Sequence, residues 1–180
     1  MKQRRGCGGI DMFRDILDVL LDYTQEEGPL GFTRFDVKLL ITWIMAELLH
    51  YPTILSKLKH ELSEKLLPGK PVQEQDIPQL PYLTAVIKET MRLHPASPLL
   101  LPHRAERDSM IQGYTIPKHT RVLVNFWSMS MDPAYWDEHA RFDPDRFLNS
   151  DNVGFRGSSD FKFVPFGAGR RVCPGLELLE

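Results

Sequence analysis

The segment around Cys173 holds the residues of this chain that are best suited to chemistry. This cysteine stands near the end of a glycine-rich run that begins at Phe163 and reads FVPFGAGRRVCPG. Pro174 suits the first turn of a helix, which the leucines that follow can continue. A sulfur at this position faces unpaired backbone N–H groups and the positive end of the helix dipole, and both favour thiolate over thiol. The pattern therefore predicts a Cys173 thiolate that can act as an iron ligand.

The neighbours of Cys173 favour a metal that is held in a flat macrocycle. Glycines remove side chains where such a group would approach the backbone closely, and they stand at Gly167, Gly169 and Gly175. Arg171 offers a fixed cation to a carboxylate substituent such as a propionate.

Other interpretations of Cys173 stay open at this point. It could be a half-buried structural cysteine behind a surface turn. A catalytic thiol would need a histidine base, but the histidines of this chain stand in unconnected local contexts. Zinc is favoured still less, because neither Cys173 nor Cys7 belongs to a C-x-x-C pair. Cys7 is expected to be an exposed thiol in a terminal segment.

The composition is typical of a soluble globular domain, with 180 residues, 42% of them hydrophobic and 26% charged. A net charge of −2 gives no reason to expect nucleic acid as a partner, since nucleic-acid-binding domains usually carry a clustered basic face. Two cysteines at opposite ends of the chain suggest no disulfide framework, so we expect a reducing compartment.

No run of about 18 apolar residues is present, so we expect neither a membrane anchor nor a targeting signal in this chain. The nearest candidate, Phe35 to Leu49, is interrupted by charged residues and is predicted to be a helix buried within the protein.

Helical patterns fill the first half of the chain, and a single incomplete domain with a mainly α fold and a small β portion is expected. The helical part covers 11–93, with helices at 11–23, 35–49, 52–66 and 81–93. A small β region follows at 94–131, with an extended stretch over 109–124 and a short helix over 126–131. An ordered loop and the cysteine segment cover 132–180, and the aromatic-rich loop over 132–165 is long enough to be functional.

Glu89 and Arg92 stand three residues apart on the helix at 81–93, facing away from its apolar stripe. Taken alone, they would form an ordinary surface ion pair worth a few tenths of a kcal/mol.

The residues from Phe166 to Gly175 resemble the F-x-x-G-x-R-x-C-x-G haem-binding signature of the cytochrome P450 superfamily at every fixed position. The resemblance implies haem b, with Cys173 as the axial ligand and with Phe166, Gly169, Arg171 and Gly175 around the cofactor. In that superfamily the thiolate donates electrons that favour O–O cleavage.

Further motifs extend the resemblance. Glu89 and Arg92 match the E-x-x-R of the superfamily, and Arg146 in FDPDRF matches the loop arginine that completes it, although Asp145 replaces the usual glutamate. The resemblance implies a structural network of these three residues that holds the loop carrying Cys173. It also implies a place near a haem propionate for His103, whose alternative is a surface turn residue.

The resemblance implies a partial haem-thiolate monooxygenase fold and the insertion of one oxygen atom of dioxygen into a small organic substrate, with electrons from a flavin reductase. Full-length members lie at the cytosolic face of the endoplasmic reticulum membrane. The segments MAELLHYP, from Met45, and LLPHRA, from Leu100, are similar to plant members that hydroxylate terpenoids or phenolics. The alternatives are a non-catalytic remnant with weak or no haem binding and, without a positive feature in its favour, a structural interaction module.

One departure concerns the distal side of the haem. The helix at 35–49 resembles the long distal helix of the superfamily, but the A-G-x-D/E-T-T stretch that seats dioxygen and relays protons there is absent. Thr42 is the only hydroxyl of this helix and does not replace that stretch. We therefore expect a C-terminal fragment with an internal gap in the distal helix.

Overall fold

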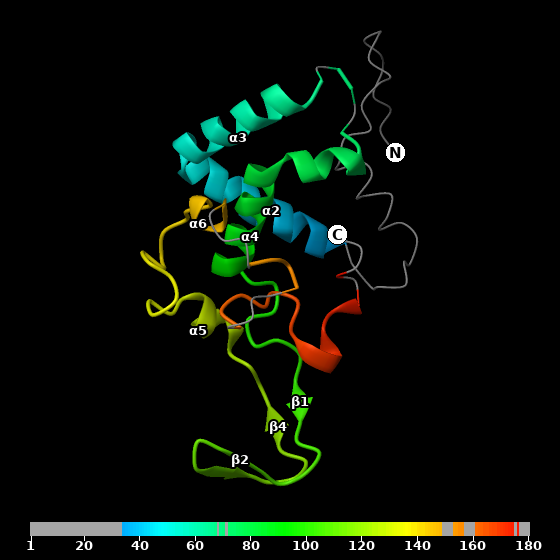
Figure 1. Cartoon of the computed structure of the whole chain (residues 1–180), viewed down its shortest axis with the longest axis vertical. Coiled ribbons are helices and arrows are strands. Elements are labelled where there is room, and N and C mark those ends of the chain that lie inside the picture. The colour runs from blue at the N-terminus through cyan, green and yellow to red at the C-terminus, as the bar shows by residue number, and fades with distance from the viewer. Residues whose placement is uncertain are drawn as a thin grey trace, which may run out of the picture.

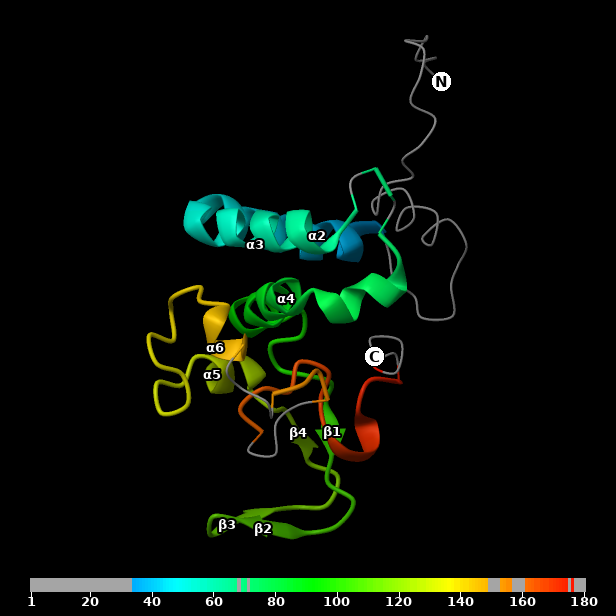
Figure 2. The same ribbon diagram turned by 45° about the horizontal axis from the view of Figure 1, so that its top comes forward.

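The fold is a stack of helices above a loop-rich layer, from which short strands project. A computed structural model describes residues 34–67, 69–70, 72–148, 153–156, 161–174 and 176, with side chains from residue 41 onward. Its elements in chain order are α2 (Arg34–His50), α3 (Pro52–Lys65), η1 (Glu74–Gln79), α4 (Pro81–Leu93), β1 (His103–Arg104), β2 (Ser109–Ile111), β3 (Tyr114–Ile116), β4 (Arg121–Val122), α5 (Phe126–Ser130), α6 (Asp145–Leu148) and η2 (Gly169–Arg171). Helices α2 and α3 lie over α4, and the strands extend away at the opposite end (Figures 1 and 2).

The mainly α fold with a small β portion is confirmed. The helices predicted at 35–49, 52–66, 81–93 and 126–131 correspond to α2, α3, α4 and α5, and no end is shifted by more than one residue. The loop predicted over 132–165 contains the one-turn helix α6, which periodicity could not reveal in four residues. The helix predicted at 11–23 lies outside the described residues.

The interpretation of α2 as a buried helix is wrong for much of its surface. Leu48 is buried and packs with Leu58 of α3 and Val86 of α4. Trp43, Met45 and Leu49 are nevertheless 40%, 47% and 67% exposed, because α3 and α4 cover only one side of the helix. No helix of the described part of the chain is long and apolar enough to cross a lipid bilayer.

Helix α4 begins at Pro81 and is capped by a side chain from another helix. Leu80, its N-cap residue, offers no side-chain acceptor. The Glu61 carboxylate of α3 instead accepts the backbone N–H groups of Tyr82 at 2.7 Å and Leu83 at 2.9 Å. A carboxylate at this end satisfies free donors and meets the positive end of the helix dipole. Glu61 therefore fixes the start of α4 relative to α3.

The β portion consists of two small antiparallel ladders, β1 with β4 and β2 with β3. His103 pairs with Val122 in the first, and Ile111 pairs with Tyr114 in the second. Positive φ angles of 48° at Gln112 and 84° at Gly113 define a type I′ turn between β2 and β3. The extended stretch predicted over 109–124 thus contains the tight hairpin of β2 and β3 and the short strand β4.

Aromatic side chains of the long loop form a core beneath α4. Buried residues from α4, α5, α6 and the loop make up this cluster: Ala85, Phe126, Trp136, Phe147, Val153, Phe163 and Val164. The rings of Phe147 and Phe163 lie 5.1 Å apart, and Ala168 of the glycine-rich run packs against the same cluster. The loop is therefore held by a hydrophobic core of its own, which also reaches the cysteine segment.

Tyr82 belongs to the core cluster between α2, α3 and α4, and it makes the stability of the fold decrease at alkaline pH. Burial raises the pKa of Tyr82 from 10.0 to about 12, and nearby carboxylates, with Asp145 first, add to the effect. The folded chain keeps the neutral phenol to a higher pH than the unfolded chain. The contribution of Tyr82 to stability is therefore complete below its unfolded pKa of 10.0 and is lost as the pH rises through about 12. In urea denaturation at several pH values, Tyr82→Phe should lose less stability across this window than the parent; an equal loss would contradict the assignment.

Candidate functional site

The run that carries Cys173 is a tight, hydrogen-bonded loop. The Cys173 N–H group donates to the Phe166 carbonyl at 2.9 Å, and the Gly167 N–H group donates to the Val164 carbonyl at 2.9 Å. Gly167 and Gly169 have φ angles of 74° and 69°, a backbone conformation that strongly favours glycine. These glycines are therefore needed for the path of the loop as well as for the space beside it.

The thiol of Cys173 lies half-buried at the end of this loop and is free. A Cβ atom added at Gly169 would meet nothing within 4 Å, so open space adjoins the loop. Arg171 is exposed, and the Leu176 N–H group donates to the Cys173 carbonyl at 3.2 Å, which turns the chain directly after the cysteine. Gly175 and most of the helix predicted after Pro174 lie outside the described residues.

His103 lies on β1 and is half-buried, so it belongs to a strand and not to a surface turn. Strand β1 and helix η2 of the cysteine run lie side by side in both views (Figures 1 and 2). Glu106 and Arg170 form an exposed contact of 3.8 Å between the chain after β1 and η2. Among the described residues, no hydrogen bond or ion pair joins His103 or Arg171 to the thiol.

The structure brings Glu89, Arg92 and Arg146 together. Arg92 donates to both carboxylate oxygens of Glu89 at 2.8 Å, and Arg146 Nε donates to Glu89 Oε1 at 3.1 Å. The Asp143 N–H group donates to the same oxygen at 2.9 Å. Glu89 and Arg92 are completely buried, so the interpretation of this pair as an ordinary surface ion pair is wrong.

Arg92 also binds the backbone of the long loop, which the sequence did not reveal. Its Nη1 donates to the carbonyls of Ser130 and His139, both at 2.7 Å, and its Nη2 donates to that of Arg141 at 3.2 Å. The Trp136 ring lies 5.4 Å from the Arg92 guanidinium and adds a cation–π contact. A single side chain of α4 thus fixes the loop at several points along its length.

Asp145 has a role of its own in this arrangement. It forms an ion pair with Lys57 of α3, and its N–H group donates to the Asp143 side chain at 3.2 Å. The residue that departs from the superfamily pattern therefore ties α6 to α3, while the neighbouring Arg146 makes the contact to Glu89.

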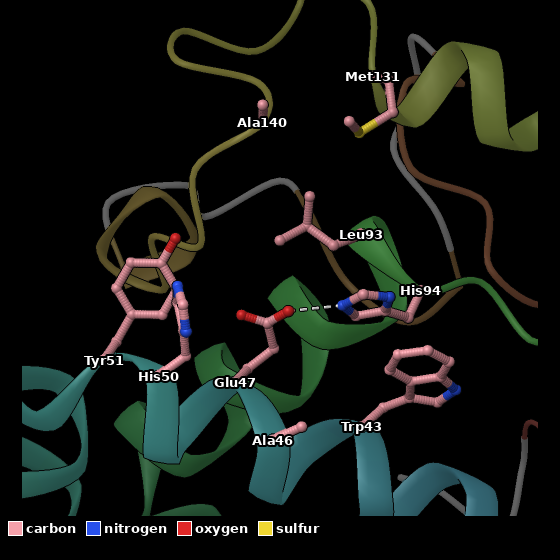
Figure 3. A pocket seen from close by; sticks show the side chains of 9 residues that line it. All are labelled: Trp43, Ala46, Glu47, His50, Tyr51, Leu93, His94, Met131 and Ala140. Carbon is pink, nitrogen blue, oxygen red and sulfur yellow. Dashed lines mark hydrogen bonds and ion pairs between the residues drawn. The ribbon is translucent and has the colours of Figure 1, made fainter.

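A pocket of about 440 Å³ lies between α2, the end of α4 and the long loop (Figure 3). It is lined by Trp43, Ala46, Glu47, His50, Tyr51, Leu93, His94, Met131 and Ala140. His94 lies 2.7 Å from a Glu47 carboxylate oxygen and stacks on Trp43 with 4.3 Å between ring centroids. None of the residues predicted for the haem site lines this pocket. It lies between α2 and α4 and is separate from the cysteine loop.

The donor set suits a metal that is already held by a macrocycle. Within the described residues, no group of three or more His, Cys, Asp or Glu side chains could hold a bare metal ion. One half-buried sulfur, on a loop whose Gly169 borders open space, supplies a single axial ligand, which is what a haem iron takes from the protein on one face. The residues present therefore fit a haem.

Replacing Glu89 should destabilise the fold strongly. Glu89→Gln leaves the buried Arg92 guanidinium without its counter-ion, which costs about 3–5 kcal/mol in the free energy of unfolding. Glu138→Gln is the matched control, because the Arg141–Glu138 pair is 60% and 67% exposed and should contribute about 0.5 kcal/mol or less. Chemical denaturation measures both variants, and a similar small loss in the two would show that the buried network is not needed for stability.

Comparisons with known proteins agree with this geometry. A family model described as cytochrome P450 matches residues 39–178. A probable (S)-N-methylcoclaurine 3'-hydroxylase of Coptis japonica is 41% identical over 186 residues, which cover 99% of this chain and 38% of that protein. A flavonoid 3'-monooxygenase of Crocosmia x crocosmiiflora is 42% identical over 184 residues, covering 91% of this chain and 36% of that protein.

Solved structures give the same result. The structure of a zebra fish cytochrome P450 with progesterone superposes with a TM-score of 0.70 at 37% identity, covering 92% of this chain and 40% of that one. The chain thus spans about two fifths of the length of the proteins it matches, and its fold is part of theirs. On the family model and these relatives, the chain belongs to the cytochrome P450 family.

Proposed function

We propose that this chain carries the thiolate side of a haem-dependent monooxygenase site, with Cys173 as the axial ligand of the iron of haem b. The observation that supports this most directly is the loop itself. Two glycines with positive φ angles and the Cys173–Phe166 hydrogen bond hold a half-buried free thiol, and open space lies at Gly169 of the same loop. Members of the family that the chain matches bind a haem as their cofactor.

Different residues of the chain contact different parts of the haem. The Cys173 sulfur supplies the ligand, and Gly169 leaves room for a flat group next to the loop. Arg171 and His103 bind the propionate carboxylates, one from η2 and one from the neighbouring β1. Phe166 holds the Cys173 N–H group through its carbonyl, and Gly175 is the last fixed residue of the signature run. Glu89, Arg92 and Arg146 hold the long loop against α4.

When bound, the haem supplies the redox chemistry that activates dioxygen and transfers one of its oxygen atoms to a small organic substrate. We propose a flavin reductase as the electron donor and, for the full-length protein, the cytosolic face of the endoplasmic reticulum membrane as the location. A phenolic or terpenoid of plant secondary metabolism is the proposed substrate class. The names of two relatives, a hydroxylase of (S)-N-methylcoclaurine and a flavonoid monooxygenase, support hydroxylation of such compounds.

A second candidate function is haem binding without turnover. It is favoured by the distal side, because the sequence lacks the A-G-x-D/E-T-T stretch and Thr42 of α2 is exposed to solvent. In this case the thiolate loop would be intact and the oxygen-activating side incomplete.

Reconstitution of the chain with haemin tests both candidates. After reduction and addition of carbon monoxide, we expect the red-shifted Soret band of a thiolate-ligated ferrous complex. Cys173→Ser should abolish this band, because a neutral hydroxyl does not replace the thiolate. Cys7→Ser is the matched control and should retain it. Absence of the band in the parent chain would refute haem-thiolate binding, and a band without peroxide-supported hydroxylation would favour the non-catalytic candidate.

Two neighbouring arginines allow a test of the propionate contact. Arg171→Gln removes one charge-assisted contact worth about 1 kcal/mol, so haem should dissociate about fivefold faster. Arg170→Gln is the matched control and should leave the rate unchanged, since the contact of Arg170 within the described residues is an exposed one of 3.8 Å with Glu106. Haem transfer to an excess of apomyoglobin measures both rates. Equal rates for the two variants would remove Arg171 from the site.

A further inference from the structure

Lys88 of α4 is partly buried and contacts a distant segment of the chain. Its Nζ donates to the Val153 carbonyl at 2.8 Å, across 65 positions of sequence. The same ammonium lies 5.4 Å from the ring centroid of Phe155. Burial lowers the pKa of Lys88, so its charge is partly removed from water and depends on these two contacts. Lys88 therefore holds the short segment 153–156 against α4.

Phe155 passes this contact on to the cysteine loop. Its ring meets the ring of Phe166 edge to face, with 6.2 Å between centroids and an interplanar angle of 70°. The backbone carbonyl of Phe166 accepts the Cys173 N–H group at 2.9 Å. A continuous set of contacts thus joins the ammonium of Lys88 to the residue that bears the thiol.

This set of contacts is separate from the Glu89 network. Glu89 and Arg92 fix the backbone between Ser130 and Asp143, whereas Lys88 fixes the chain at Val153. Val153 is 3% exposed and belongs to the same core cluster as Phe163 and Val164, which lead into the cysteine run. Lys88 is thus a second point at which α4 holds the long loop, and this point is nearer to Cys173 in the sequence than the contacts of Glu89 and Arg92.

We propose that Lys88 is a positioning residue for Cys173, acting through Phe155 and Phe166 to hold the thiol loop against α4. The effect of Lys88 on haem ligation rests on the proposed function. Its effect on the position of the loop does not require a haem. Among the described residues, the contacts of Lys88 are to Val153 and Phe155 and not to the Cys173 thiol. Its loss should leave the ligand in place and make the loop open more often.

The rate at which Cys173 reacts with a thiol reagent tests this without haem. In a Cys7→Ser background, where Cys173 is the only thiol, Lys88→Met should raise the rate about threefold or more because the loop opens more often. Lys88→Arg keeps the donor and the cation and should restore a rate within about twofold of the parent. Lys59→Met removes an exposed lysine of α3 and should leave the rate unchanged.

Circular dichroism and melting establish that each variant is folded. Phe155→Leu leaves the residues of α4 unchanged and removes the ring contacts with Phe166 and Lys88, and it should also raise the rate about threefold or more. If Lys88→Met does not fold, the rate measured for Phe155→Leu tests the proposal in its place. Parent-like rates in the folded variants, or an equal rise in Lys59→Met, would overturn the proposal.

A second arm uses the haem-loaded chain. Lys88→Met should move part of the ferrous carbon monoxide complex from the thiolate-ligated band to the unshifted band, and Lys88→Arg should restore it. An unchanged distribution in folded Lys88→Met overturns the role in ligation. If the parent itself gives no thiolate band, the proposed function fails, and the rate of thiol modification still decides whether Lys88 positions the loop.

Discussion

The position of the long loop on α4 depends on a single buried carboxylate, that of Glu89. It accepts hydrogen bonds from two guanidinium groups and a backbone N–H group in a place from which water is excluded. An unpaired charge there would be costly, so the loop must deliver Arg146 and Asp143 to fixed positions. The position of the loop is therefore set largely by electrostatics, and the aromatic core beneath α4 fills the space that remains.

Helix α4 is the common support of these contacts. Its start is capped by Glu61 of α3, its middle presents Lys88 and Glu89 to different parts of the loop, and its end binds Glu47 of α2 through His94. The helical layer and the cysteine loop are thus fixed relative to each other through one 13-residue element. A cysteine on a loop with little regular structure can in this way be held by rigid elements.

Sequence patterns predicted the helices well because α3 and α4 have clear apolar stripes and begin with proline. They also predicted the contact between Glu89, Arg92 and Arg146, but through family resemblance and not through spacing. The burial of Glu89 and the exposure of Trp43 were missed, since both depend on which elements pack against a helix. The carbonyl partners of Arg92 and the role of Lys88 were missed as well, because a backbone acceptor leaves no signature in residue type.

The carbonyl contacts of Arg92 bear on the order in which the chain folds. The acceptors at Ser130, His139 and Arg141 lie 38, 47 and 49 positions further along the sequence. On a ribosome that adds about 5–20 residues per second, α4 leaves the exit tunnel seconds before its acceptors leave it. Until then the Arg92 guanidinium has Glu89 of the same helix as a partner but lacks its carbonyl acceptors, so the pair stays hydrated. Docking of α4 is therefore a late step that waits for the loop, and the nascent helix bundle passes through a stage in which its most buried charge is still in water.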